Sequence, residues 1–459
     1  MPSEFDKDGK NRLELIYGLN DRPAPADAVF AAFQHFLAIF VAIITPPLIV
    51  SEALSFDIHM KSYLISMSLF VSGISTFIQV KKIGPIGSGL LSIQGTSFTF
   101  LTSLIGVGLA AKNAGATAEG VLSTILGVCF IGSFFQMLIS RFVHRLKKII
   151  TPLVSGIVVT LIGLSLTKVA IIDMGGGKAL LNNSPQMFGS MENLLLSFFV
   201  VAVVVIFNCS RQKYLRMGAI MIGLFVGSMV CIFLGKVDFS KLSEFNLLVV
   251  PVPFKYGFFK FDFLSLLPFS ILYLISTMES IGDLTATSMI SGEPIKGEKY
   301  FRRISGGVLA DGFNSGLASI FNSFPNTTFA QNNGIIQMTG IASRNVGYYI
   351  AGFLMLVGMF PVVGAVFSLI PSPVFGGASL IMFGTVAASG IKMIASSHID
   401  RRGMLIISVS ISLGLGVTFV PELLQHFSPL AREIFGSPIT SGGLSAILLN
   451  TILPRSEKS

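Results

Sequence analysis

Charged residues are scarce in this chain. Asp, Glu, Lys and Arg make up 12% of its 459 residues, tryptophan is absent, and there are three cysteines. Cys129, Cys209 and Cys231 all lie within apolar runs, and an odd number of cysteines does not indicate a disulfide framework. We expect them to be small core residues. With 52% hydrophobic residues, the chain is too apolar for one soluble domain, so it is predicted to be an integral membrane protein in a lipid bilayer.

Long apolar runs recur along the whole chain. A helix needs about 20 mostly apolar residues to cross the hydrocarbon, and runs of this kind, separated by charged or Gly/Pro-rich breaks, mark the spans. The predicted spans are 28–50, 62–80, 84–109, 120–140, 149–171, 193–210, 217–235, 263–288, 304–323, 327–342, 346–369, 374–394, 402–420 and 439–454. The sequence therefore predicts an all-α polytopic membrane protein with fourteen transmembrane spans.

The positive charges predict how the chain is oriented. Most of the 32 Lys and Arg residues lie in the two tails, 1–27 and 455–459, and in the loops after even-numbered spans. Because positively charged loops stay in the cytoplasm, both tails are expected there. The tail 1–27 lacks the apolar segment of a signal peptide, so no cleaved leader is expected. The net charge of +9 is thus a topology signal, and no nucleic-acid partner is expected.

The sequence lacks the common motifs of enzyme chemistry. It has no Walker A motif, no G-x-S-x-G elbow and no H-E-x-x-H, and no His/Cys/Glu cluster at ligand spacing. A membrane enzyme, a metal site and a bound cofactor are therefore not expected. Without an ATP site, transport would be driven by an ion gradient or would run passively.

Two of the predicted spans are interrupted by polar, glycine-rich sequence. They contain GPIGSGLLSIQGTSFTF (84–100) and FPNTTFAQNNGIIQMTG (324–340), which are the third spans of two seven-span halves. An odd number of spans per repeat makes the halves point in opposite directions, and broken spans at matching positions are typical of a transporter's binding site. Irregular backbone at membrane depth is tolerated only beside protein or a water-filled cavity. We therefore expect Gln331, Asn332 and Asn333 to line a site.

A few ionisable residues fall inside the predicted spans, where each is a functional candidate because its burial is costly. Glu279 and Asp283 are four residues apart and share a helix face. Two neighbouring carboxylates favour one shared or retained proton. Asp311 lies among glycines that allow close packing, and either a protonation site or a cap for a broken neighbour fits it. His35 fits either a functional polar role or a packed hydrogen-bonding role.

The stretch QNNGIIQMTG (331–340) resembles the signature of the nucleobase-ascorbate transporter family, also called nucleobase:cation symporter-2. That signature is Gln or Glu, Asn, any residue, Gly, four further residues, Thr, and then Gly, Arg or Lys. Gln331, Asn332, Gly334, Thr339 and Gly340 fill it. The resemblance extends over nearly the whole chain, including the segment ESIGDLTATS that contains Asp283, and the chain is similar in particular to bacterial xanthine and uric acid permeases.

This resemblance implies an architecture. Family members have fourteen spans in a seven-plus-seven inverted repeat, with short β-strands in broken spans three and ten. The implied core domain covers 28–140 and 263–369, and the implied gate domain covers 141–262 and 370–454. The substrate would bind between the crossing strands, the core would move against the gate like an elevator, and the gate would form a homodimer.

The resemblance also implies residue roles. Glu279 and Gln331 would hydrogen-bond a purine, Asp311 would serve proton coupling, and His35 and Asn332 would support affinity and site geometry. Phe98 and Phe329, one in each broken span, could stack on the ring, although core packing is the other reading for both.

Two positions bear on specificity. Gln331 favours a purine, because uracil-transporting relatives have Glu there. Ser97 replaces the Asn of xanthine-selective relatives and leaves room for uric acid.

The sequence thus predicts a proton-coupled symporter that imports xanthine, with uric acid as a candidate second substrate, across a bacterial inner membrane. A uracil or pyrimidine permease is disfavoured by Gln331, and an anion exchanger of the same architecture by Glu279. A passive channel would need a continuous polar stripe, whereas the polar residues cluster at the two broken spans. Sodium remains an alternative coupling ion.

Overall fold

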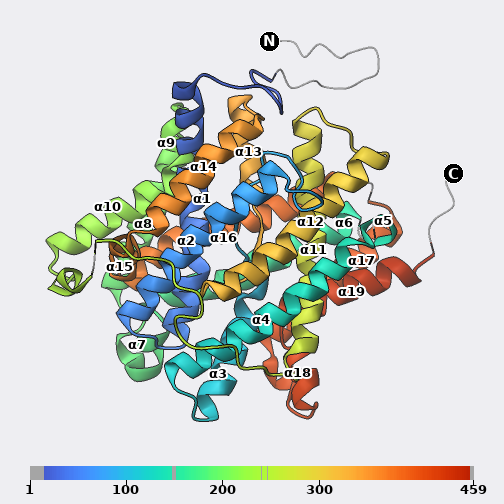
Figure 1. Ribbon diagram of the computed structural model, residues 1–459. Helices are drawn as coiled ribbons and strands as arrows, with labels where there is room; N and C mark the ends of the chain where they lie inside the picture. Colours follow the sequence, from blue (N-terminus) through green and yellow to red (C-terminus); the bar gives the residue numbers. More distant parts are fainter. Residues whose placement is uncertain (1–14, 147–150, 239, 246, 398, 455–459) are drawn as a thin grey trace.

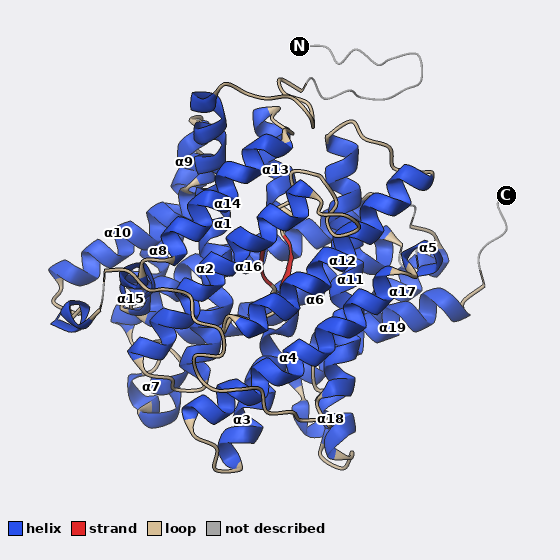
Figure 2. Cartoon of the chain, in the orientation of Figure 1, coloured by secondary structure: helices blue, strands red, loops and turns tan. Residues whose placement is uncertain are grey.

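The computed structural model describes residues 15–146, 151–238, 240–245, 247–397 and 399–454. Nearly all of the regular structure is helical, and the described residues contain one small sheet of two strands near the middle of the molecule (Figures 1 and 2).

The first half of the chain runs from a 29-residue helix to a short 3₁₀ helix. Its elements are α1 (Pro25–Ala53), α2 (Ile58–Lys81), β1 (Gln94–Thr96), η1 (Phe98–Phe100), α3 (Leu101–Asn113), α4 (Ala118–Ser140), α5 (Val143–Leu146), α6 (Pro152–Met174), α7 (Lys178–Asn183), η2 (Pro185–Met187), α8 (Met191–Asn208), α9 (Lys213–Met217), α10 (Ala219–Phe233) and η3 (Ser240–Glu244). Side-chain caps such as Asp57 before α2, which accepts a 2.6 Å hydrogen bond from the Met60 amide, set where several of these helices begin.

The second half repeats the strand-then-helix pattern. Its elements are α11 (Leu266–Ile290), α12 (Glu298–Ile320), β2 (Asn326–Thr328), α13 (Gln331–Thr339), α14 (Arg344–Gly358), α15 (Pro361–Ser368), α16 (Ser372–Ala395), α17 (Arg401–Phe419), η4 (Pro421–Leu424), α18 (Pro429–Phe435) and α19 (Pro438–Ile452). Helices α14 and α15 form one apolar unit that bends by 73° at a short break.

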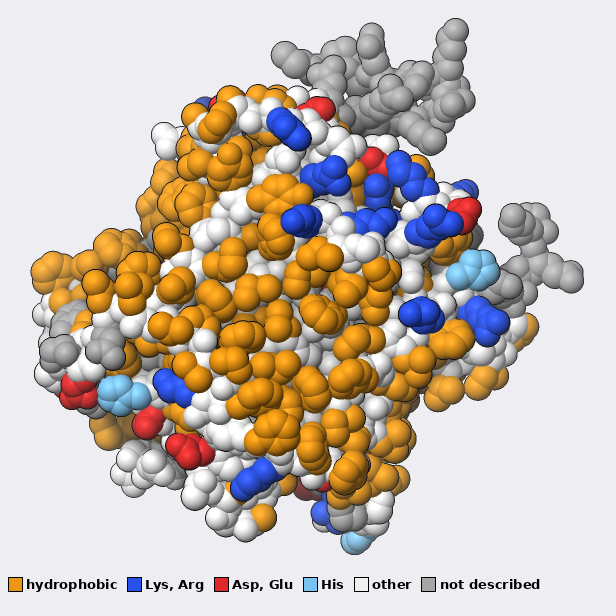
Figure 3. Space-filling model, in the orientation of Figure 1, with side chains coloured by type: hydrophobic (Ala, Val, Ile, Leu, Met, Phe, Trp, Pro, Cys, Tyr) orange, Lys and Arg blue, Asp and Glu red, His pale blue; other side chains and the backbone are white. Residues whose placement is uncertain are grey.

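Seven of the described helices are long and apolar enough to cross a membrane, or eight if the bent pair is one span. Each of the fourteen predicted segments coincides with a helix, the bent pair or a strand followed by a helix. The remaining segments are not long, continuous apolar helices: two are broken by a strand, α10 and α19 are short, and α11 and α12 carry polar side chains. A broad apolar surface covers the middle of the molecule, and Lys and Arg gather toward one end (Figure 3).

The two strands pair antiparallel, with Gly95 opposite Thr327, as expected from the two broken segments. All six strand residues are buried. The Gly95 position has no room for a side chain, because a Cβ there would lie 2.1 Å from Cε2 of Phe329. This close approach brings the start of α13 against the first broken segment.

The helices pack in two groups. Helices α1 to α4 pack with α11, α12 and α14, whereas α6 packs with α16 and α19, and α8 packs with α10 and α16. Helix α11 contacts both groups through α4 and α6. A site on α11 therefore lies where the groups meet.

The cysteine prediction was partly wrong. Cys129 and Cys231 are buried, as expected, but Cys209 is exposed because α8 ends at Asn208 and Cys209 forms its C-terminal cap. All three thiols are free.

Candidate functional site

A cavity of about 430 Å³ lies between α11, the two broken segments and the helices α6 and α16. Both β-strands end beside it, so η1 and α13 begin at its wall. Its lining includes Phe98, Glu279, Asp283, Phe329, Gln331 and Gly334. The structure thus brings six of the predicted site residues together from three separate stretches of sequence.

Glu279 projects from the middle of α11 into this cavity. Its Oε2 atom accepts a 3.0 Å hydrogen bond from Oγ1 of Thr99, which lies in η1 of the first broken segment. A charge-assisted bond of this kind orients a half-buried carboxylate. Glu279 is therefore a fixed acceptor on the cavity wall.

Gln331 is the first residue of α13 and also lines the cavity. The first turn of a helix has backbone N–H groups without helical partners and carries partial positive charge. Gln331 adds a carboxamide, which can donate and accept at the same time. This end of α13 can therefore bind a polar planar ligand.

The two asparagines after Gln331 have different environments. Asn332 turns away from the cavity: its Nδ2 atom donates to the Leu91 carbonyl at 2.5 Å, and its side chain faces His35. Asn333 lines the cavity, and its Oδ1 atom accepts a 2.6 Å hydrogen bond from Thr287 of α11. Asn332 therefore belongs to the support of the site, whereas Asn333 joins α13 to α11.

Asp283 lies one turn after Glu279 and lines the same cavity. Its Oδ2 atom accepts a 3.3 Å hydrogen bond from Thr328 at the end of β2. Its backbone carbonyl accepts from Asn333 at 3.4 Å. Asp283 therefore ties α11 to the second broken segment.

Asp311 is fully buried in α12, outside the cavity lining that the described residues form. Its Oδ1 atom accepts from Nε2 of Gln94 at 2.8 Å and from Nε2 of Gln79 at 3.5 Å. Its Oδ2 atom accepts from the Ser280 hydroxyl. The carboxylate is thus held behind the binding wall by β1, α2 and α11.

His35 is fully buried in α1, which packs against α13. Among the residues that the structure describes, neither ring nitrogen has a partner with hydrogen-bond geometry. The ring faces Asn332 and does not join the residues that line the cavity. Its position fits a supporting role for the start of α13.

The two phenylalanines lie on the cavity wall, one from each broken segment. Phe98 packs edge-on against Phe383 of α16, with ring centroids 5.6 Å apart. Ser97 is buried beside Phe98, outside the described lining, and its Oγ atom accepts from the Thr99 amide at 3.3 Å. Ser97 therefore caps η1 and does not face the cavity.

The remaining signature residues shape α13. Gly334 lines the cavity, and a Cβ there would meet only open space. Thr339 donates from Oγ1 to the Ile335 carbonyl at 2.8 Å. Gly340 ends the helix with a positive φ of 70°, a conformation that favours glycine, and its carbonyl accepts from the Ile16 and Tyr17 amides.

Several functional candidates were not singled out from the sequence. Thr99 and Gln94 lie in the broken segment that was identified, and Ser280 follows Glu279, but only the packed structure shows which carboxylate each one contacts. Lys392 of α16 also lines the cavity. It lies inside the predicted span 374–394 but was not among the ionisable residues singled out there.

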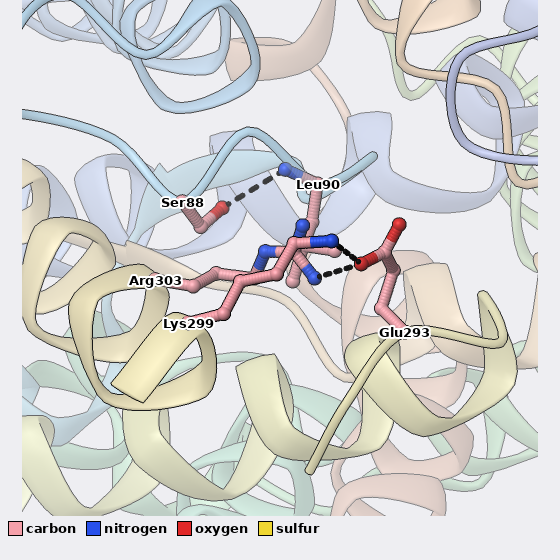
Figure 4. Close-up of polar contacts among 5 residues, drawn as sticks. All are labelled: Ser88, Leu90, Glu293, Lys299 and Arg303. Atoms are coloured by element: carbon pink, nitrogen blue, oxygen red, sulfur yellow. Dashed lines mark hydrogen bonds and ion pairs between the residues drawn. The ribbon is translucent and has the colours of Figure 1, made fainter. Parts of the chain in front are cut away.

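An ion cluster lies beside the loop that leads into β1. Glu293 accepts from Nη1 of Arg303 at 2.9 Å and from Nζ of Lys299 at 3.0 Å, and Figure 4 shows Ser88 and Leu90 next to this cluster. Burial would raise the pKa of Glu293, but the hydrogen bonds and positive charges of Lys299 and Arg303 outweigh it and lower that pKa. One turn after Arg303, the Gly306 carbonyl accepts from the Gly87 amide at 2.8 Å. The cluster thus lies where α12 supports the first broken segment.

Comparisons of the sequence with a family model and with known proteins all match permeases. A family model described as "Permease family" matches residues 26–423. The chain is 48% identical to the xanthine permease XanQ of Escherichia coli K12 over 96% of this chain and 94% of that protein. It is 45% identical to the xanthine permease XanP of the same organism over 96% and 95% of the two chains.

A solved structure shows the same fold at much lower identity. The murine Solute Carrier 26 family member A9 anion transporter matches with a TM-score of 0.58 and 11% identity, over 94% of this chain and 69% of that one. At this identity the likeness shows the fold alone.

Proposed function

The chain belongs to this permease family, which is the nucleobase-ascorbate transporter family, and on that premise we propose that it is a proton-coupled xanthine importer. The observation that carries the proposal is the shared cavity of Glu279 and Gln331, in a chain with nearly half of its residues identical to a xanthine permease. The family consists of permeases, so the protein is a transporter and not an enzyme.

The chemistry of the cavity suits a xanthine ring. One edge of xanthine alternates N–H donors and C=O acceptors. The Gln331 carboxamide can pair with one donor and one acceptor, and the Glu279 carboxylate can accept from N–H groups. Phe98 and Phe329 supply apolar surface for the ring faces.

The two groups of packed helices support a division into a core (28–140 and 263–369) and a gate (141–262 and 370–454). In this proposal the chain has fourteen spans in a seven-plus-seven inverted repeat, and β1 and β2 are matching elements of its two halves. Their antiparallel pairing fits halves of opposite orientation. The core would carry the substrate against the gate in an elevator-like cycle.

The cavity also supports alternating access. Its lining reaches Ile290 and Ser396 at the ends of α11 and α16, beside loops rich in Lys and Arg. At the opposite end of α16, the Ser372 hydroxyl donates to Oε1 of Glu52 in α1 at 3.1 Å. We assign the basic end to the cytoplasm, so that the described conformation faces inward and the Glu52 contact closes the outer side.

Proton coupling is assigned to Asp311 together with Glu279, with His35 and Asn332 as supporting residues. Protonation outside would favour substrate binding, and proton loss at the cytoplasmic side would weaken it. Buried carboxylates suit this role because burial disfavours their charged form. Uric acid is proposed as a second substrate, and competition by uric acid in wild type and Ser97→Asn tests the contribution of Ser97.

The protein is a multi-pass membrane transporter, which we place in a bacterial inner membrane with both termini in the cytoplasm. A homodimer through the gate is also proposed. In the most apolar 18-residue stretch of α8, and in that of α17, 28% of the residues are buried within the chain. Both helices therefore have surface that lipid or a second copy can cover.

Uptake of radiolabelled xanthine tests the proposal in cells that lack their own purine permeases, with and without a protonophore. We expect accumulation that the protonophore abolishes and that unlabelled uric acid, but not uracil, reduces. Uptake blocked by uracil alone would indicate a pyrimidine permease, and equilibration without accumulation would indicate a channel.

A further inference from the structure

The position of Asp311 raises the question of how a proton reaches it. The residue is fully buried and lies outside the described cavity lining, so it has no direct contact with cavity water. Gln79 and Gln94 contact its Oδ1 atom through amide N–H groups. Amide groups orient a carboxylate but are poor carriers of an exchanging proton, because releasing an amide proton is unfavourable near neutral pH.

The Oδ2 atom of Asp311 has a different kind of partner. In the described part of the chain, the hydroxyl that contacts it is that of Ser280, which is also fully buried. The Ser280 Oγ atom lies 3.3 Å from Oγ1 of Thr327, and Thr327 lines the cavity. A row of two hydroxyls therefore joins the carboxylate to the cavity.

We propose that Ser280 and Thr327 form the proton relay between Asp311 and the substrate cavity. This inference rests on the proposed proton coupling and extends it to residues that have no assigned role. Ser280 lies next to Glu279 in α11, and Thr327 is the middle residue of β2. The relay thus runs directly behind the wall that binds substrate.

Ser280 has hydrogen-bond partners in both protonation states of Asp311. When the carboxylate is charged, the Ser280 hydroxyl donates to it. When the carboxylic acid is protonated, its O–H donates to Ser280, and the Ser280 hydroxyl can turn toward the Ser276 carbonyl at 3.0 Å or toward Thr327. A hydroxyl is both donor and acceptor, so neither state leaves it without a partner.

The transfer of the proton from Asp311 to the cavity conserves the number of protons on each hydroxyl. The acid proton of Asp311 passes to Ser280 while the Ser280 proton passes to Thr327 and the Thr327 proton passes to a cavity water. Three O–H bonds break and three form, and each hydroxyl keeps one proton. Rotation of both hydroxyls then restores the donation from Ser280 to the carboxylate. Glu279 and Asp283 are the other carboxylates on this part of the cavity wall.

Purified protein in liposomes tests the relay through Ser280→Ala. The measurements are xanthine affinity, xanthine counterflow at equal pH, and uptake driven by a pH gradient with a trapped pH dye. We expect the initial rate of gradient-driven uptake and its proton flux to fall by about 10-fold or more, because positioned proton-transfer groups contribute at least that much. Affinity and counterflow should stay within about 2-fold, since affinity is set at the cavity and counterflow needs no net proton release.

Matched variants separate the relay from a structural effect. Ser276→Ala removes a buried hydroxyl one turn earlier in α11 that makes no hydrogen bond to Asp311 or to any other described residue, and it should leave all three measurements unchanged. Thr327→Val keeps the shape but removes the second hydroxyl, and it should lower proton flux as Ser280→Ala does, whereas Thr327→Ser should retain it.

Normal proton flux in both Ser280→Ala and Thr327→Val would overturn the relay, and so would an equal loss of affinity, counterflow and flux in Ser280→Ala. If wild type itself shows xanthine counterflow without gradient-driven uptake, proton coupling fails and the relay fails with it, while xanthine transport stands.

Discussion

The two broken segments share a backbone plan but differ in what their side chains contact. Each enters as a short strand and continues as a helix at the same cavity. In the first segment, Gln94 and Thr99 direct their polar groups at Asp311 and Glu279. In the second, Gln331 and Asn333 line the cavity.

This difference indicates a division of roles between the two broken segments. The first segment holds Glu279 and Asp311 in place, whereas the second presents the Gln331 carboxamide to the cavity. The polar recognition of the substrate then depends mainly on the second segment, although each segment contributes one phenylalanine to the cavity wall. The following substitutions test this division.

Neutralising the carboxylates should have the largest effect. Glu279→Gln and Asp311→Asn should each reduce xanthine accumulation by about 100-fold or more, because each removes a titratable group from the proposed coupling path. Glu279→Gln should also weaken xanthine binding, since Glu279 lies on the cavity wall, whereas Asp311→Asn should bind xanthine nearly as wild type does.

Binding by the purified variants and uptake in cells measure these two effects, and size-exclusion chromatography checks that each variant is folded. Full accumulation in either variant would remove that residue from the coupling path. Loss of binding in folded Asp311→Asn would show that the first segment and its carboxylate also recognise substrate.

The glycines of the two segments should respond very differently to alanine. In Gly95→Ala the new methyl group would meet Phe329 at 2.1 Å and Ile43 at 2.7 Å, so the Phe329 ring, which lines the cavity, must shift. Overpacking of this kind costs about 1–3 kcal/mol. We expect a lower melting temperature in detergent and a KM for xanthine raised by about 10-fold.

Gly334→Ala is the matched comparison for folding. Its methyl group would meet open space, and alanine is favoured over glycine in a helix by about 1 kcal/mol, so the melting temperature should be unchanged or higher. Equal destabilisation by the two substitutions would contradict the close packing at Gly95.

The sequence predicted the elements of the site better than their contacts. The polar stretches 84–100 and 324–340 were recognised because glycine and amide side chains are costly in an apolar span, and both strands were found there. Glu279 and Gln331 line one cavity, and the purine contacts that the family resemblance implied for them stay predictions.

The supporting contacts could not be predicted in the same way. Ser97 was expected near the ligand but caps η1, and the partners of Asp311 come from α2, β1 and α11. Such contacts join residues up to 232 positions apart, as between Gln79 and Asp311, and local sequence carries no signal for them.

One glutamine in each segment gives a matched pair. Gln331→Leu should weaken xanthine binding by about 10-fold or more, because a hydrogen bond is worth about 0.5–1.5 kcal/mol and the carboxamide can make two. Gln94→Leu should change xanthine affinity by less than about 3-fold but reduce gradient-driven uptake, since Gln94 contacts Asp311 and not the cavity. Calorimetric titration and uptake distinguish them, and the reverse pattern would exchange the roles of the two segments.

The smallest effect is expected at Glu293, whose ion cluster lies beside the loop that leads into β1. The lowered pKa of Glu293 means that its carboxylate stabilises the folded protein above its ordinary pKa of 4.5, and that this stabilisation is lost as pH falls through the lowered folded value. Glu293→Gln should therefore reduce stability by about 1 kcal/mol at pH 7, as expected for a partly exposed ion pair. Wild type and variant should converge at the lowest pH at which the protein stays folded. Melting curves in detergent between pH 7 and that limit measure this difference.

The exposed pair of Arg302 and Glu298 offers the control: Glu298→Gln should change the melting temperature less, because both side chains of that pair are largely exposed. A Glu293→Gln difference that does not shrink toward acid would mean that Glu293 supports the loop before β1 by packing, and that its charge contributes nothing.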